Sequence, residues 1–444
     1  MLDRLHNNIL IVGLLSIILL GAMALDRSLC LMTAGTLMAF VTQMGLLLYS
    51  MRGTNKEYSE MSLFGTVLVY SLLVGAVFMI ISVIYSGDTF MFSKSDAWLY
   101  YTNSMRSRDI GLAANLKRLA KLYEFEDLGA LYYDSILMAI IPSKFFLNIV
   151  NMFTGALSAV MLFRIGRHFM SETYAYMGAL AYGTSSYLIF FHCSFLKESF
   201  FVFLVICAMY FFYRAIADGI LWSLVFSAVF LGLILFFRPA VSALLFVSFL
   251  SYFALSSRQG SALSFFLYGG ALVLLVLSLT VMQGLVDNYT GGDLGAMVDY
   301  GTVDGYSSKF SLFVSSFAAP FGPFPSLFPK TPGSPITINF YGAGLTYRLF
   351  LVIPLWMGVI YSIKEKNKLL APVVVFVIAG MLGTAFVMAS LELRKVMTHI
   401  PFTLILAFYG LYIWERQERK SIISEPIIHA FAVGILVLWN LIRG

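Results

Sequence analysis

Long apolar stretches alternate with short polar stretches along almost the whole chain. A helix that crosses the hydrocarbon core of a bilayer needs roughly 20 apolar residues, and about thirteen stretches approach that length. The pattern therefore predicts an all-α, polytopic transmembrane helical bundle, with residues 1–444 forming a single integral membrane domain. The predicted spans are 8–26, 29–50, 62–86, 143–163, 173–193, 199–213, 220–237, 240–257, 261–284, 346–363, 369–390, 396–414 and 427–442.

Two longer segments, 87–142 and 285–345, interrupt these spans. Within the first, residues 97–105 and 113–133 carry apolar and tyrosine side chains at helical spacing, with Lys and Arg between them. This spacing predicts amphipathic helices that lie on the membrane surface. The second segment is rich in Gly, Asp and Pro, and its composition fits either a lid over an external cavity or a disordered connection.

Composition excludes a soluble domain, because 60% of the residues are hydrophobic, only 12% are charged and the mean hydropathy is +0.86. The net charge is +6, but Lys and Arg are scattered among loops, which argues against a nucleic-acid partner. Most of them share the side of the N-terminus, so the positive-inside rule places the N-terminus in the cytoplasm and both long segments outside. The three cysteines have no spacing that predicts a disulfide framework or a zinc site.

Two carboxylates, Asp88 and Asp96, follow the third apolar stretch in S-G-D-T-F-M-F-S-K-S-D-A-W-L-Y-Y. A carboxylate at the end of a span can hold a proton or a cation in a water-filled recess. Asp88 follows a glycine, and capping of a turn explains it. Asp96 shares a helix face with Tyr100, four residues later. Capping of an interfacial helix is the structural alternative for Asp96, and we interpret Asp96 as the functional carboxylate.

Charged residues also stand at the predicted external ends of later spans. Lys197 and Glu198 interrupt an apolar run, where charges are costly unless they are paired or solvated. The structural alternative is a turn in which Lys197 reaches the interface and Glu198 favours a helix N-terminus. Arg238 precedes Pro239 and is placed either to bind phosphate through two hydrogen bonds or to pair with a carboxylate.

A dense charge cluster enters the twelfth predicted span in L-E-L-R-K-V-M-T-H-I-P-F. Arg394, Lys395 and His399 would bind a pyrophosphate there, with His399 donating a hydrogen bond. An ordinary solvated loop is the alternative, and we favour binding. Arg348, which opens the tenth span, is a weaker candidate of the same kind, whereas His192 is interpreted as a packed histidine.

The order of these features resembles the GT-C superfamily of polytopic glycosyltransferases, particularly bacterial enzymes that build surface polysaccharide from polyprenyl-linked sugars. The resemblance covers roughly residues 90 to 415 and uses S-D-A-W-L-Y-Y, F-L-K-E-S, the Arg-Pro step and E-L-R-K-V-M-T-H-I-P. Two features depart from it. Three apolar stretches precede Asp96, where many members have one, and the following segment has no paired Asp-Asp or Asp-Glu to hold a metal.

The resemblance implies a sugar or glycan donor on polyprenyl phosphate or diphosphate, and a glycan or lipid-linked acceptor. It also implies the bacterial inner membrane, with the active site on the periplasmic side. Asp96 would be the general base, and arginines would stabilise the departing phosphate. No cofactor is certain and a divalent metal ion stays open, as does the choice between single-sugar transfer and O-antigen-type repeat-unit polymerisation. The implied substrate-binding residues are Tyr100, Lys197, Glu198, Arg238, Arg348, Arg394, Lys395 and His399.

Two other classes of function fit part of the pattern. A flippase or transporter of lipid-linked glycans also needs cationic cavities, but its charges should lie near the middle of the membrane. A non-catalytic scaffold in an assembly complex would leave the external carboxylate and cations without a common pocket. The grouping of the charged candidates on one external face favours the enzyme.

Overall fold

The computed structural model describes residues 30–51, 58–90, 94–123, 125–256, 351–382 and 396–416, which form fourteen helices and no strand. The helices are α2 (Cys30–Met51), α3 (Glu60–Ser86), α4 (Lys94–Ile110), α5 (Leu112–Leu122), α6 (Phe125–Ile140), α7 (Lys144–Gly166), α8 (Glu172–Gly183), α9 (Ser186–Cys193), α10 (Glu198–Ile216), α11 (Ser223–Leu235), α12 (Pro239–Ser256), α17 (Val352–Lys364), α18 (Ala371–Leu382) and α20 (Ile400–Arg416). Outside the described residues lie the predicted spans 8–26, 261–284 and 427–442, the segment 285–345, and Arg348, Arg394 and Lys395.

The prediction of an all-α chain with membrane-type helices is confirmed for the described residues. Four of their helices are long and apolar enough to cross a bilayer, namely residues Glu60–Ile84 of α3, and α7, α10 and α12. Three apolar helices, α11, α17 and α18, are shorter. At 1.5 Å per residue, α11 extends only about 20 Å, less than the hydrocarbon core of about 30 Å. The predicted number of about thirteen spans is therefore not confirmed.

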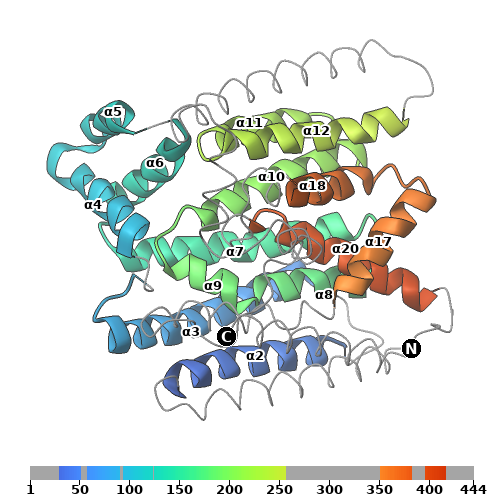
Figure 1. Ribbon diagram of the computed structural model, residues 1–444, viewed down its shortest axis with the longest axis horizontal. Coiled ribbons are helices and arrows are strands. Elements are labelled where there is room, and N and C mark those ends of the chain that lie inside the picture. The colour runs from blue at the N-terminus through green and yellow to red at the C-terminus, as the bar shows by residue number, and fades with distance from the viewer. Residues whose placement is uncertain are drawn as a thin grey trace, which may run out of the picture.

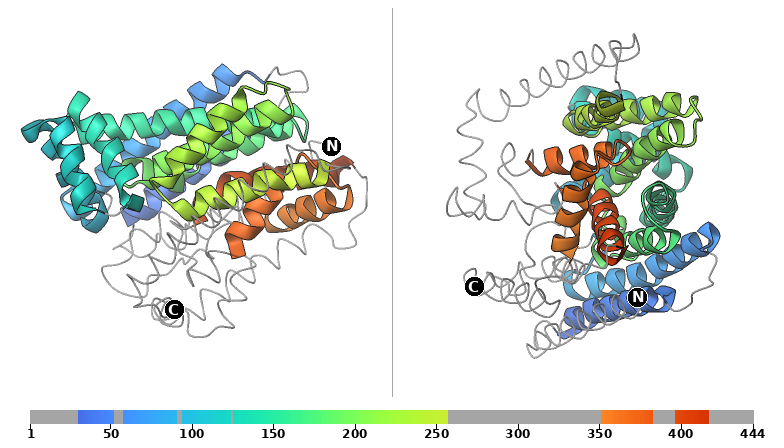
Figure 2. Two further views of the ribbon diagram at one scale, coloured as in Figure 1. Left: turned by 90° about the horizontal axis from the view of Figure 1, so that it is seen from above. Right: turned by 90° about the vertical axis from the view of Figure 1, so that its right-hand side faces the viewer.

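The long helices lie side by side, and α4, α5 and α6 pack together across one end of the bundle (Figures 1 and 2). We call these three helices the cap. The C-terminal end of α3, the N-terminal end of α7 and the turn between α11 and α12 lie at the same end of the bundle (Figure 1). Segments that are up to about 150 residues apart in the sequence therefore meet beside the cap.

Two predicted elements are wrong in detail. Residues 113–133 form the separate helices α5 and α6, because the backbone is extended at Tyr123 and the acidic residues that follow suit the start of a new helix. The predicted span 173–193 is divided into α8 and α9 at Thr184 and Ser185. There the Thr184 hydroxyl donates to the Leu180 carbonyl oxygen at 2.7 Å, a side-chain bond that competes with the helical ladder.

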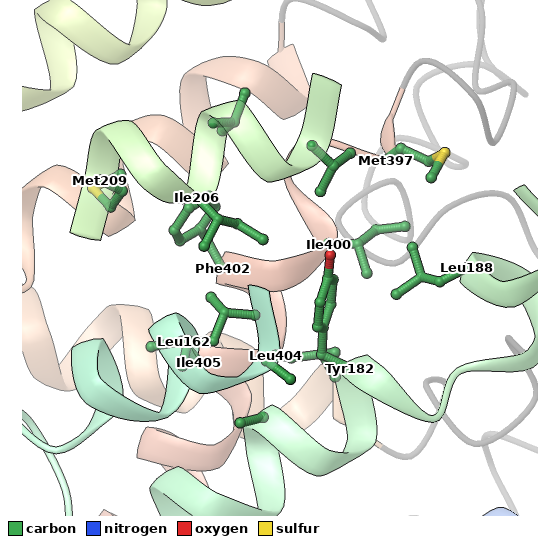
Figure 3. Packing of buried hydrophobic residues seen from close by; sticks show 14 of the residues in the cluster. Leu162, Tyr182, Leu188, Ile206, Met209, Met397, Ile400, Phe402, Leu404 and Ile405 are labelled. Carbon is green, nitrogen blue, oxygen red and sulfur yellow. The ribbon is translucent and has the colours of Figure 1, made fainter. Parts of the chain in front are cut away.

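The interior of the bundle is filled by large apolar side chains from helices that are distant in the sequence. Leu162 of α7, Ile206 of α10 and Leu404 of α20 are at most 1% exposed, and they lie together in Figure 3. Because lipid tails are as apolar as these side chains, close van der Waals packing has to supply much of the association between the helices. Substitutions that disturb close backbone approach should therefore be costly.

Gly410 provides a test of this packing. A Cβ atom on Gly410 of α20 would overlap the Pro354 carbonyl oxygen of α17, whereas a Cβ on Gly232 of α11 meets no heavy atom within 4 Å. We expect Gly410→Ala to lower the free energy of unfolding by about 1–3 kcal/mol, because the two backbones must separate. Gly232→Ala is the matched control and should not destabilise the protein. Thermal unfolding in detergent measures both, and equal melting temperatures would contradict the packing argument.

Candidate functional site

The first ion pair beside the cap joins α6 to the start of α10. Lys197 Nζ lies 2.6 Å from Asp127 Oδ1, and the two side chains are 11% and 36% exposed. The Tyr100 hydroxyl of α4 donates to the same Asp127 oxygen at 3.4 Å. Asp127 therefore holds the ammonium group of Lys197 in place and connects it with the face of α4 that carries Tyr100.

A second ion pair lies directly beside the first one. Arg238 Nη2 is 3.4 Å from Glu198 Oε1, and the Glu198 side chain is only 1% exposed. The Arg238 guanidinium carbon also lies 5.6 Å from the centre of the Phe201 ring, a cation–π arrangement. The structural alternative for Arg238, pairing with a carboxylate, is therefore observed. The guanidinium group has more donors than this single contact uses.

A close approach between α6 and the α11–α12 turn brings the two pairs together. The Gly129 backbone N–H donates to the Phe236 carbonyl oxygen at 2.9 Å, and a Cβ atom on Gly129 would overlap the Phe237 ring. Glycine is thus the residue that allows α6 to reach Phe236 and Phe237, the two residues before Arg238. The position of Asp127, two residues before Gly129, depends on the same contact.

Asp96 lies in the first turn of α4, and its predicted helical relation to Tyr100 is confirmed. Aromatic contacts anchor this part of α4 on the α9–α10 turn, since the ring centres of Tyr101 and Phe195 are 5.5 Å apart. Phe195 has φ = 59°, a left-handed conformation that is rare for a bulky residue. Such strain is found mainly where the surrounding structure holds a functional residue in place, and Lys197 follows two residues later.

Asp88 has the structural role that its sequence context predicts. Its Oδ1 accepts a hydrogen bond from the Phe90 backbone N–H at 2.8 Å, which closes a short turn after α3. Lys144 of α7 covers the same turn, with Nζ 2.9 Å from Thr89 Oγ1 and 3.6 Å from the centre of the Phe90 ring. These contacts account for Asp88 without a catalytic role.

His399 lies immediately before α20 and is 4% exposed. Within the described part of the chain, its buried Nδ1 has no hydrogen-bond partner. His192, by contrast, is buried and contacts the Ser199 hydroxyl, in agreement with its interpretation as a packed histidine.

Two carboxylates of α6, Asp127 and Asp134, are not among the residues that the sequence pattern singles out. Asp127 stands in the polar run Y-E-F-E-D and looks like a solvated acid, so its pairing with Lys197 has no local indication. Asp134 stands in the apolar run L-Y-Y-D-S-I-L-M and is 5% exposed. A charged residue in an apolar run is costly, and this criterion selects Lys197 and Glu198 as candidate functional residues. The same criterion also selects Asp134.

The two carboxylates Asp127 and Asp96 take different places at this end of the bundle, because Asp127 contacts a cation and Asp96 lies in the first turn of α4. Asp127 is directly paired with Lys197. Asp96 lies about 6 Å from Tyr100 along the same helix, given a rise of 1.5 Å per residue. Through Tyr100 and Asp127, the helix that carries Asp96 is connected with the Lys197 ammonium group.

Among the described residues, no group of three His, Cys, Asp or Glu side chains has the arrangement of a metal site. Comparison of the sequence with protein-family models found no matching family, and comparison with curated proteins found no similar sequence. The residues themselves therefore carry the functional argument.

The two ion pairs should differ in their importance for stability. Arg238→Ala would leave the Glu198 carboxylate buried without this partner, and we expect a loss of about 3–5 kcal/mol in the free energy of unfolding. Lys197→Ala should cost much less, because Asp127 is 36% exposed and can be hydrated. Adding Glu198→Gln to Arg238→Ala should recover part of the loss. Thermal unfolding of the four proteins measures these differences, and equal effects of the two alanine variants would refute them.

Proposed function

We propose that the protein is a membrane glycosyltransferase that uses a sugar or glycan donor linked to polyprenyl phosphate or diphosphate. The observation that carries the proposal is the pairing of Lys197 and Arg238 beside the cap, where Asp127 also contacts Tyr100 of α4, the helix that carries Asp96 in its first turn. A hydroxyl acceptor needs a base, and a lipid-phosphate leaving group needs cations, so this site supplies both requirements. The resemblance to the GT-C superfamily supports the same chemistry.

The proposed reaction is a substitution at the sugar carbon that bears the phosphate. The acceptor oxygen forms the new carbon–oxygen bond while Asp96 takes its proton. The bond between the sugar carbon and the phosphate oxygen breaks, and its electron pair leaves with the lipid phosphate. Arg238 and Lys197 stabilise the charge that develops on that phosphate.

Asp127 and Glu198 are proposed to position these cations. Each holds one basic side chain by a single close contact, so each cation keeps further donors for a ligand. His399 remains a proposed ligand, with a buried ring nitrogen just before α20. Arg348, Arg394 and Lys395 remain proposed ligands of the same phosphate groups, and the donor and acceptor remain a polyprenyl-linked glycan and a glycan or lipid-linked hydroxyl.

The proposed setting is the bacterial inner membrane, with the N-terminus in the cytoplasm and the cap on the periplasmic side. The distribution of Lys and Arg in short loops supports this orientation. The product belongs to surface polysaccharide, made by transfer of one sugar or of an O-antigen-type repeat unit. A flippase for the same lipids is the rival, and it would move the donor without forming a glycosidic bond.

Asp96→Asn tests the base. The amide keeps the size and hydrogen-bonding capacity of the side chain but cannot accept the proton, so we expect transfer to fall by about 10² to 10⁴ with donor binding retained. Asp88→Asn is the matched control, because an amide oxygen can still accept the Phe90 N–H, and its transfer rate should be normal. Purified protein with a radiolabelled polyprenyl-linked glycan measures both variants. Normal transfer by Asp96→Asn would exclude this base.

Arg238→Lys tests the phosphate contact without removing the partner of Glu198. Lysine keeps the positive charge but cannot form the two parallel hydrogen bonds of a guanidinium group. We expect affinity for the lipid-linked donor to fall about tenfold, as the loss of one charge-assisted hydrogen bond predicts. Arg164→Lys is the matched control, because Arg164 pairs with Glu60 and lies at the C-terminal end of α7, away from the cap. Unchanged affinity in Arg238→Lys would remove Arg238 from the donor site.

A further inference from the structure

Asp134 is a buried carboxyl group in the middle of α6. Its residue exposure is 5%, and no hydrogen bond or ion pair is formed by its side chain with the described part of the chain. Burial raises the pKa of Asp134 well above its usual range, so its neutral form is favoured. Moving a carboxyl group from water into a largely buried position costs free energy unless the site compensates for it, so Asp134 is an unusual residue to keep for stability alone.

The neighbours of Asp134 on α6 do have partners. The Tyr133 hydroxyl donates to Asn151 Oδ1 at 2.9 Å, and the Tyr133 ring stacks on Phe200 at 3.8 Å between ring centres. On the other side, Ser135 Oγ lies 3.3 Å from Asn115 Nδ2. Tyr133 and Ser135 therefore attach α6 to its neighbours, and Asp134 takes no part in that attachment.

Asp134 shares its helix face with Asp127. Seven residues separate them, which is two turns of a helix and about 10 Å along its axis. Asp127 reaches Lys197 and Tyr100 from this face. The face of α6 that lines the candidate site therefore carries a paired carboxylate at its beginning and a carboxyl group without a described partner two turns further on.

We propose that Asp134 is a second ligand-binding residue of this site, one that donates a hydrogen bond to a hydroxyl oxygen of the carbohydrate part of the substrate. This assignment rests on the proposed function and specifies which part of the substrate lies against α6. A neutral carboxylic acid has both a donor and an acceptor, which matches a sugar hydroxyl. The separation from Lys197 and Arg238 places the carbohydrate along α6 when the phosphate lies against the cations.

Substitutions of Asp134 test whether its carboxyl group binds the substrate or has no function. Asp134→Leu removes the polar group at similar volume, and we expect an equal or higher melting temperature together with about tenfold weaker substrate use, the equivalent of one lost hydrogen bond. Asp134→Asn keeps an N–H donor and should be intermediate. Asp109→Leu, at an exposed cap carboxylate, is the control and should leave transfer unchanged. Full transfer by Asp134→Leu would overturn the proposal, as would equal losses in Asp134→Leu and Asp134→Asn.

Chemical labelling tests the same proposal without an activity measurement. A hydrophobic carbodiimide adds to a protonated carboxyl group, and the adduct rearranges to a stable acylurea without loss of atoms. In the full chain in detergent, peptide mass spectrometry should find the adduct at Asp134 and not at the paired Asp127. A polyprenyl diphosphate that carries an oligosaccharide should protect Asp134, whereas the same lipid diphosphate without sugar should not.

The outcomes separate this proposal from the proposed function. Absence of an adduct at Asp134, or equal protection by both lipids, would overturn the carbohydrate contact. If the lipid diphosphate still binds and Arg238→Lys weakens that binding, the proposed function survives this result. If the chain binds neither lipid, the donor assignment fails, and the assignment of Asp134 fails with it.

Discussion

A buried charge needs a partner, and this requirement organises the end of the bundle that carries the candidate site. Lys197 and Glu198 are adjacent in the chain, yet they pair with different elements, Asp127 of α6 and Arg238 at the start of α12. The turn before α10 is thereby tied to two other segments. Glu198 is 1% exposed, so its carboxylate depends on Arg238 far more than the half-solvated Asp127 depends on Lys197.

An anionic ligand of this site would have to share Lys197 and Arg238 with the carboxylates of Asp127 and Glu198. A phosphate group that binds Arg238 or Lys197 competes with a carboxylate that already occupies part of the cation. Guanidinium and ammonium groups have several donors, so the ligand can use those that the carboxylate leaves available. For the proposed phosphate ligand, the internal carboxylates would weaken binding but hold the cations in one geometry, which would lower the ordering cost at binding. This balance suits the proposed reaction, in which a substrate must bind, react and leave.

Apolar length correctly predicted an all-helical chain for the described residues, and four of their helices are long and apolar enough to cross a bilayer, whereas the predicted number of spans is not confirmed. Local rules also identified the Asp88 turn and the shared face of Asp96 and Tyr100. The pairing of Lys197 with Asp127 follows from neither rule, since the partners are far apart in sequence and meet only because α6 packs beside the α11–α12 turn. Helix breaks were missed for a related reason, because hydroxyl side chains end α8 inside an apolar run.

The cap shows how one helix can give two identical side chains different chemistry. Asp127 lies in the first turn of α6, where Lys197 Nζ and the Tyr100 hydroxyl both contact its carboxylate. Two turns later, Asp134 lies among apolar residues, and desolvation favours its neutral form. Pairs of acids whose environments differ in this way commonly divide the roles of anion and proton donor. The difference follows from the position of α6, because the start of the helix reaches the charged turn, whereas Asp134 lies two turns further on and is 5% exposed.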